Sequence, residues 1–86
     1  MLNQLVLVGK FMGLDDDIME VALPKEANST EQETYSIIVG ENMSKAVFEN
    51  LKEGDMIGIK GRLTKVGGIQ FVKCEKLTFL SSNKNH

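Results

Sequence analysis

The chain has 86 residues and a mass of 9.5 kDa, which predicts a single domain with one modest hydrophobic core. Apolar residues make up 42% of it, too many for a disordered chain, and no stretch approaches the ~20 apolar residues of a membrane span. We find no signal-peptide pattern, and the single cysteine, Cys74, excludes an internal disulfide. We therefore expect a cytoplasmic protein.

The net charge of −2 conceals an uneven distribution. Residues 1–56 carry eleven acids and four bases, whereas residues 57–86 carry six bases and one acid, giving −7 and +5. The basic part favours an anionic partner. The alternative is a chance distribution that folding mixes.

The first half of the chain reads as three strands. Residues 2–11 place Leu, Val and Phe on both faces of an extended chain, which predicts a strand buried on both sides. After a turn at Asp15-Asp16-Asp17, residues 18–23 alternate until Pro24. Residues 24–33 form a polar loop, and 35–39 form the third strand.

The second half reads as one helix and two strands. The helix starts with Asn42 as its cap, ends near Gly54, and has an apolar face made of Met43, Ala46, Val47 and Leu51. Residues 55–65 and 69–80 form a hairpin with a tight turn at 66–68. A bulge near Glu75–Lys76 would bring Val72, Cys74, Leu77 and Phe79 to one face.

A helix between the third and fourth of five strands is the layout of the OB-fold, an all-β, partly open five-stranded barrel that often binds oligonucleotides. We therefore predict one OB-fold domain over residues 1–80 and a flexible tail over 81–86.

Two stretches resemble bacterial single-stranded DNA-binding proteins. Residues 3–10, Asn-Gln-Leu-Val-Leu-Val-Gly-Lys, are similar to that family's opening strand. Residues 49–63 resemble its helix end and fourth strand, with a Lys-x-Gly-Asp turn followed by Gly-Arg-Leu. Ile38-Val39-Gly40 and Leu77-Thr78-Phe79-Leu80 fit the ends of its third and fifth strands. The resemblance spans most of residues 1–80 and implies single-stranded DNA binding in replication, recombination or repair.

The chain also departs from that family. It has no Trp, although the family stacks bases on several aromatic residues. Its Gly67-Gly68 turn replaces a long DNA-contacting hairpin, and it ends in Asn-Lys-Asn-His without the family's acidic tip. The resemblance is therefore to a minimal member.

Sequence-independent binding of single strands needs a cationic groove for phosphates and aromatic faces for bases. Lys60 and Arg62 lie two apart on the face of their strand opposite Ile57 and Ile59, while Tyr35 falls on the third strand. The alternatives are solubilising charges and half-buried packing. Phe11, Phe48 and Phe79 are assigned to the core. The predicted DNA-binding residues are Lys10, Tyr35, Lys60, Arg62, Lys65, Phe71 and Lys73.

No residue pattern predicts an enzyme, a cofactor, a small-molecule substrate or a membrane partner. Asp15-Asp16-Asp17 has no further metal-ligand spacing, so no metal site is predicted, and Cys74 reads as a small buried apolar residue. The apolar first strand predicts a homodimer or homotetramer. The alternative function is an OB-fold protein-interaction or assembly domain with weak or lost nucleic-acid binding.

Overall fold

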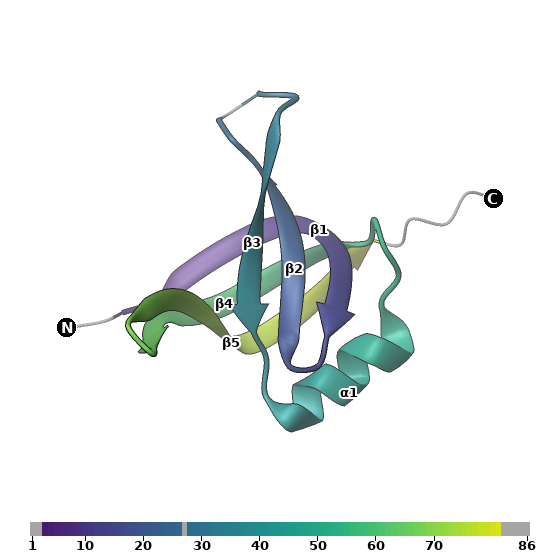
Figure 1. The fold of residues 1–86 in the computed structure, drawn as a ribbon. Helices are drawn as coiled ribbons and strands as arrows, with labels where there is room; N and C mark the ends of the chain where they lie inside the picture. Colours follow the sequence, from purple (N-terminus) through teal and green to yellow (C-terminus); the bar gives the residue numbers. More distant parts are fainter. Residues whose placement is uncertain (1–2, 27, 82–86) are drawn as a thin grey trace.

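The computed structural model describes residues 3–26 and 28–81, which form five strands and one helix (Figure 1). Ser81 closes the last strand, so that strand runs one residue past the expected domain boundary, and residues 82–86 of the predicted tail lie outside the described part. No helix in the described part is long and apolar enough to cross a membrane. The elements are β1 (Leu5–Asp15), β2 (Ile18–Pro24), β3 (Gln32–Ile38), α1 (Glu41–Asn50), β4 (Met56–Val66) and β5 (Ile69–Ser81).

The strands close into a barrel in the order β1-β2-β3-β5-β4, with β4 returning to β1. All neighbours are antiparallel except β3 and β5, which pair in parallel over only two residue pairs, Ile37 with Val72 and Ile38 with Lys73. Helix α1 lies between β3 and β4 in the chain and beside one end of the barrel (Figure 1). The predicted OB-fold is confirmed.

The core fills the inside of this barrel. Every second residue of a strand points inward, so the inward positions of β2, β3 and β4 supply most of the deeply buried side chains. Val47 and Leu51 from the helical segment join the same cluster. Among the residues that the structure describes, seven side chains are less than 2% exposed: Met19, Val21, Ile37, Val39, Val47, Ile57 and Ile59.

Strand β1 is buried on one face only, so the prediction of burial on both faces is wrong. Leu7 and Phe11 face the core, whereas Val6 is 74% exposed and Val8 is 51% exposed. A barrel of this size offers each strand a single interior, and α1 covers a different region. The outer face of β1 therefore carries apolar side chains that the monomer leaves in solvent.

Helix α1 differs from the prediction at both its start and its surface. It begins at Glu41 with Gly40 as N-cap and no side-chain cap, so Asn42 does not cap it. Phe48 is 80% exposed and Ala46 is also exposed. The reason is geometric: a helix on the barrel end buries one narrow stripe, which here holds Val47 and partly Met43.

The predicted bulge in β5 is confirmed. Lys60 pairs with Lys76 and Gly61 pairs with Cys74, so Glu75 is the extra residue. A Cβ atom at position 61 would overlap the main-chain carbonyl of Lys73, and glycine is therefore required opposite the bulge. The bulge lets Cys74 and Leu77 pack on the same core.

Phe79 does not complete that core, because it lies near the C-terminal end of β5 and is 50% exposed.

The predicted hairpin turn is confirmed: Gly67 and Gly68 have φ values of 59° and 81°, as a two-residue turn of this kind requires.

The Lys-x-Gly-Asp turn at residues 52–55 joins β1 to the start of β4. The buried Asp55 accepts a hydrogen bond from the Lys52 main-chain N–H through Oδ2 at 2.9 Å. The Gly54 N–H donates to the Phe11 carbonyl at 2.7 Å, and the Phe11 N–H donates to the Asp55 carbonyl at 2.8 Å. This motif therefore has a structural role in the barrel.

Candidate nucleic-acid interface

A groove opens where β3 and β5 separate. The two strands share only two residue pairs. The part of β3 before Ile37 and the part of β5 before Val72 therefore diverge. The space between them has a volume of about 500 Å³, within the size range of ligand sites. It is lined by Thr34, Tyr35, Ser36, Leu63, Ile69, Gln70, Phe71 and Val72.

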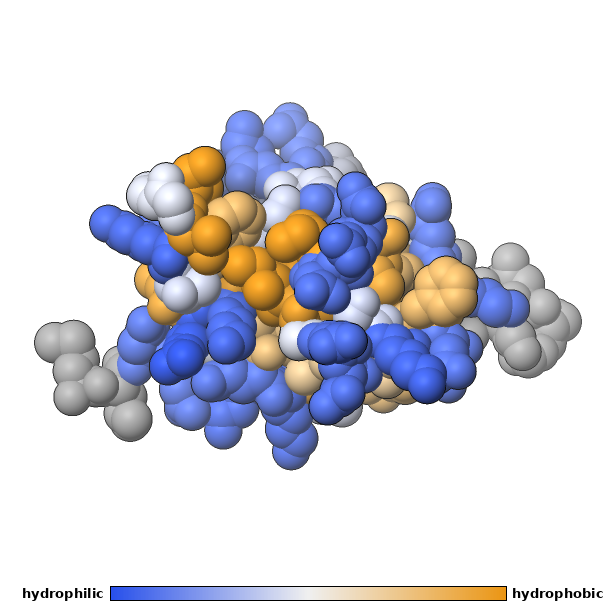
Figure 2. Space-filling view, turned by 60° about the horizontal axis from the view of Figure 1, so that its bottom comes forward, coloured by the Kyte–Doolittle hydropathy of each residue, from blue (hydrophilic) through white to orange (hydrophobic). Residues whose placement is uncertain are grey.

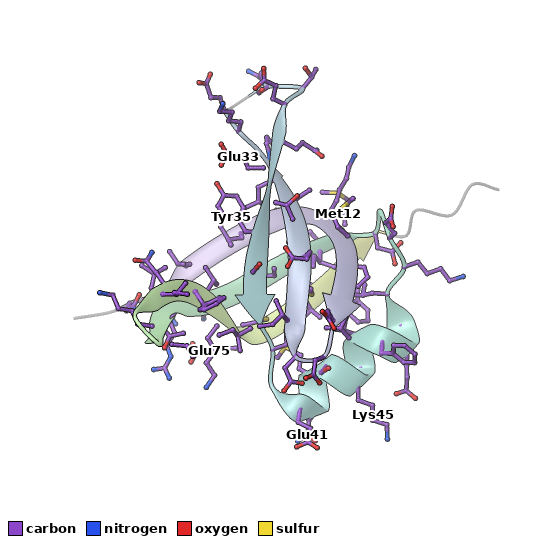
Figure 3. The ribbon with its side chains drawn as sticks, viewed as in Figure 1. Met12, Glu33, Tyr35, Glu41, Lys45 and Glu75 are labelled. Atoms are coloured by element: carbon purple, nitrogen blue, oxygen red, sulfur yellow. The ribbon has the colours of Figure 1, made fainter. Side chains whose placement is uncertain are left out.

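Tyr35 forms one wall of the groove. It shares the inward side of β3 with Ile37, but Tyr35 is 41% exposed whereas Ile37 is fully buried. Its hydroxyl donates a hydrogen bond to Glu33 Oε2 at 2.8 Å, and Figure 3 shows both side chains on the same side of β3. This hydrogen bond, with the charge of the carboxylate, raises the pKa of Tyr35 above its ordinary value.

Phe71 lines the same groove from β5. It is half-buried, pairs with Thr64 in the hairpin, and lies two residues from Lys73 on the same face of its strand. The structure therefore brings together the two predicted stacking residues, Tyr35 and Phe71, although they are 36 positions apart in the chain. No Lys or Arg lines the groove in the described part of the chain.

Four cations lie on the outer face of β4 and β5. Lys60 and Arg62 point away from Ile57 and Ile59, as predicted, and in the sheet they stand opposite Lys76 and Lys73. We call Lys60, Arg62, Lys73 and Lys76 the cationic face.

Lys76 was missed by sequence reasoning. The predicted bulge was the available signal, since one extra residue at Glu75 returns Lys76 to the outer side together with Lys73.

One acidic side chain, Glu75, partly offsets the positive charge of the cationic face. The Glu75 carboxylate lies 3.6 Å from Arg62 Nε, with both side chains about half exposed. An exposed pair of this kind contributes only ~0–1 kcal/mol and is screened by salt. Arg62 therefore remains available to a phosphate that displaces Glu75.

The other two predicted cations occupy different positions. Lys65 lies at the hairpin end and lines a smaller hollow that shares Leu63 and Gln70 with the groove. Lys10 pairs with Met56, four residues along β1 from the Val6–Lys60 pair, or about 13 Å at the usual rise per residue. Lys65 therefore flanks the groove, whereas Lys10 is separate from the cationic face.

The outer face continues from the cations onto an apolar patch. Val6, Val8 and Leu80 line a hollow of about 300 Å³ together with Lys60 and Lys76. Residues 5–8 pair with β4 along one edge, and no described strand pairs with their other edge. This edge and patch form a second surface distinct from the groove.

No chemical centre accompanies these surfaces in residues 3–26 and 28–81. No three His, Cys, Asp or Glu side chains there lie close enough to hold a metal ion. Cys74 is buried, as predicted, and its thiol donates to the Lys76 carbonyl at 3.5 Å. Burial raises the pKa of this thiol, which keeps it protonated and unreactive.

Comparisons with known proteins give a clear result at the level of fold. No family model matches the sequence, and no curated protein matches it in sequence. Among solved structures, the mitochondrial single-stranded DNA-binding protein Rim1 of S. cerevisiae superposes with a TM-score of 0.76 at 12% identity, covering 96% of this chain and 100% of that one. The SSB domain of a Synechococcus sp. protein has a TM-score of 0.71 at 11% identity, covering 91% and 96%.

The chain has the fold of SSB domains. This agrees with the resemblance found in the sequence, and the match includes nearly the whole length of both neighbours. At these identities the likeness shows the shared fold, so the function rests on the surfaces of this chain.

Proposed function

We propose that the protein is a non-catalytic, cytoplasmic, single-stranded DNA-binding module that acts in replication, recombination or repair. The observation that carries this proposal is that two aromatic residues, Tyr35 of β3 and Phe71 of β5, line one groove beside the cationic face of the β4–β5 hairpin. Bases stack on aromatic rings whatever their identity, and cations follow the phosphates. Binding at these surfaces is therefore largely independent of sequence.

The cationic face supplies the attraction for the backbone. Phe71 and Lys73 lie two residues apart on one face of β5. A DNA strand with a base stacked in the groove therefore has its next phosphates near Lys73 and Arg62. Lys65 lies at the opposite end of the groove, on the hairpin. Two rings line the groove in the described structure, so one domain binds with modest affinity, and several copies on one DNA strand gain by avidity.

Self-association belongs to the same proposal. The free edge of residues 5–8 can pair with the same segment of a second copy around a two-fold axis, which would cover the exposed Val6 and Val8. The product is a homodimer, or a homotetramer when two such dimers join.

Mass in solution tests this part of the proposal. Val8→Glu should shift the protein to a monomer, because the carboxylate would have to be buried beside the patch. Val66→Glu is the matched control, since Val66 is similarly exposed, at 55%, but lies at the hairpin turn. A wild-type monomer at high concentration, or equal masses for both variants, would contradict the proposed contact.

Titration with oligonucleotides tests DNA binding itself. We expect fluorescence-anisotropy titrations to show binding of oligo-dT that weakens steeply with salt, since released counterions drive it. Oligo-rU in parallel distinguishes a DNA from an RNA preference. If no oligonucleotide binds at low salt and the protein is a stable oligomer, the alternative of a protein-interaction domain replaces the proposal.

A further inference from the structure

Glu33 does not line the base-stacking groove, but it holds a carboxylate against the hydroxyl of Tyr35, which does. Its Oε2 atom accepts the Tyr35 hydroxyl at 2.8 Å, and both side chains project from the same face of β3 because they are two residues apart (Figure 3). Within residues 3–26 and 28–81, no Lys or Arg forms an ion pair with Glu33. A carboxylate therefore lies next to the tyrosine wall, just outside the lining of the groove.

A carboxylate in this position favours some ligands and disfavours others. When ionised it only accepts hydrogen bonds, at about four lone-pair positions, and Tyr35 occupies one of them. It repels a phosphate, and in the described structure no cation lines the groove to compensate for that repulsion. The groove therefore suits the bases, and the backbone lies toward the cationic face.

The orientation of Tyr35 brings a base edge to Glu33. A base stacked flat on the phenol ring has its rim beside the rim of that ring, and the hydroxyl end of the ring is the end that contacts Glu33. Single-stranded bases are commonly read by hydrogen bonds along their Watson–Crick edges. A base in the groove can therefore place its N–H groups against the carboxylate.

We propose that Glu33 makes this groove select bases with adjacent N–H donors, guanine above all, over thymine. Guanine presents N1–H and the 2-amino group side by side, which match the two oxygens of a carboxylate. Thymine presents a single N3–H between two carbonyl oxygens, which the carboxylate repels. This preference rests on the proposed function and adds one selective position to otherwise sequence-independent binding.

Three oligonucleotides and three proteins test the preference. The probes are oligo-dT of about 12 nucleotides, within the site size of one OB-fold, and the same oligonucleotide with one central deoxyguanosine or one deoxyinosine. Deoxyinosine keeps N1–H but lacks the 2-amino group. The proteins are wild type, Glu33→Gln and Glu31→Gln. Glu31 pairs with Lys25 on the same hairpin at 3.8 Å, so its variant removes an equal charge elsewhere.

For wild type we expect the guanine probe to bind about fivefold or more tightly than oligo-dT, the low end for a bidentate base contact, and the inosine probe to fall between them. Glu33→Gln should remove the difference while still binding oligo-dT, and Glu31→Gln should retain it. Equal affinities for the three probes in wild type, or a guanine preference that survives in Glu33→Gln, would overturn the inference alone. Failure of wild type to bind oligo-dT at low salt would overturn the proposed function.

Discussion

The groove and the outer face of the barrel share the β4–β5 hairpin but have different chemistry. The groove between β3 and β5 holds Tyr35 and Phe71 and is lined by no cation in the described structure. The outer face of β4 and β5 holds four cations and continues onto an apolar patch that includes Val6 and Val8. Figure 2 shows one face of the molecule, on which hydrophobic side chains gather in the middle and hydrophilic ones surround them.

Two features of β-structure produce this difference. Alternation along β4 sends Ile59 into the core and Lys60 to the surface, and the short β3–β5 pairing leaves an opening for aromatic rings. Tyr35 is thus separated from the cationic face, whereas Phe71 adjoins that face through Lys73 on the same side of β5. It follows that substitutions can remove one contribution to binding and leave the other.

Tyr35→Ala should produce the largest loss. Removing one stacking ring costs ~1–3 kcal/mol, or about 5–150-fold in affinity for oligo-dT. The dependence of log affinity on log salt should stay as in wild type, because no charge changes. Phe48→Ala is the control, since Phe48 is an exposed ring on α1, and it should bind like wild type. A reduced salt slope in Tyr35→Ala would mean that the groove also holds phosphates.

Lys60→Ala combined with Arg62→Ala should give the next largest loss of affinity. Unlike Tyr35→Ala, it should also reduce the dependence of affinity on salt. Loss of two phosphate contacts lowers the salt slope by about 1.4 and the affinity roughly 25-fold at about 0.1 M salt. Lys25→Ala with Lys45→Ala removes the same charge from the β2–β3 hairpin and α1, and should have little effect. If both double variants weaken binding equally, net charge matters and the cationic face does not.

The smallest effect is expected in the titration of Tyr35 in the free protein. Because Glu33 raises its pKa, the hydroxyl should lose its proton at higher pH than a free tyrosine. The stabilising hydrogen bond is present below the ordinary pKa and disappears as the pH rises through the raised value.

Absorbance at alkaline pH measures this titration cleanly, since the chain has one Tyr and no Trp. Glu33→Gln should shift the midpoint down and Glu31→Gln should leave it unchanged. Identical midpoints in wild type and Glu33→Gln would show that the two side chains are not paired in solution.

The sequence predicted the barrel well because its strands alternate clearly and end at Gly, Pro or turn residues. The bulge at Glu75 was also predictable, since Cys74 and Leu77 can both face the core only if one extra residue between them shifts the inward–outward alternation of the strand. Phe48 was mispredicted because its position beside Val47 does not show how narrow the buried stripe of α1 is.

The groove is a tertiary feature and could be predicted only in part. Tyr35 and Phe71 were each recognised as possible stacking residues, but their meeting depends on where β3 leaves β5. The role of Glu33 depends on a hydrogen bond that a residue pattern does not reveal. Lys10 was grouped with the other cations because position in the sequence does not show its separation along β1.

The central claim, that bases enter the groove beside Tyr35, can be tested by tyrosine fluorescence. Tyr35 is the only tyrosine and the chain has no Trp, so its emission reports the groove alone. On titration with oligo-dT we expect the emission to be quenched and to saturate together with the anisotropy signal, whereas an abasic strand of equal length should bind more weakly and quench little. Saturable binding of oligo-dT with unchanged Tyr35 emission would contradict the account.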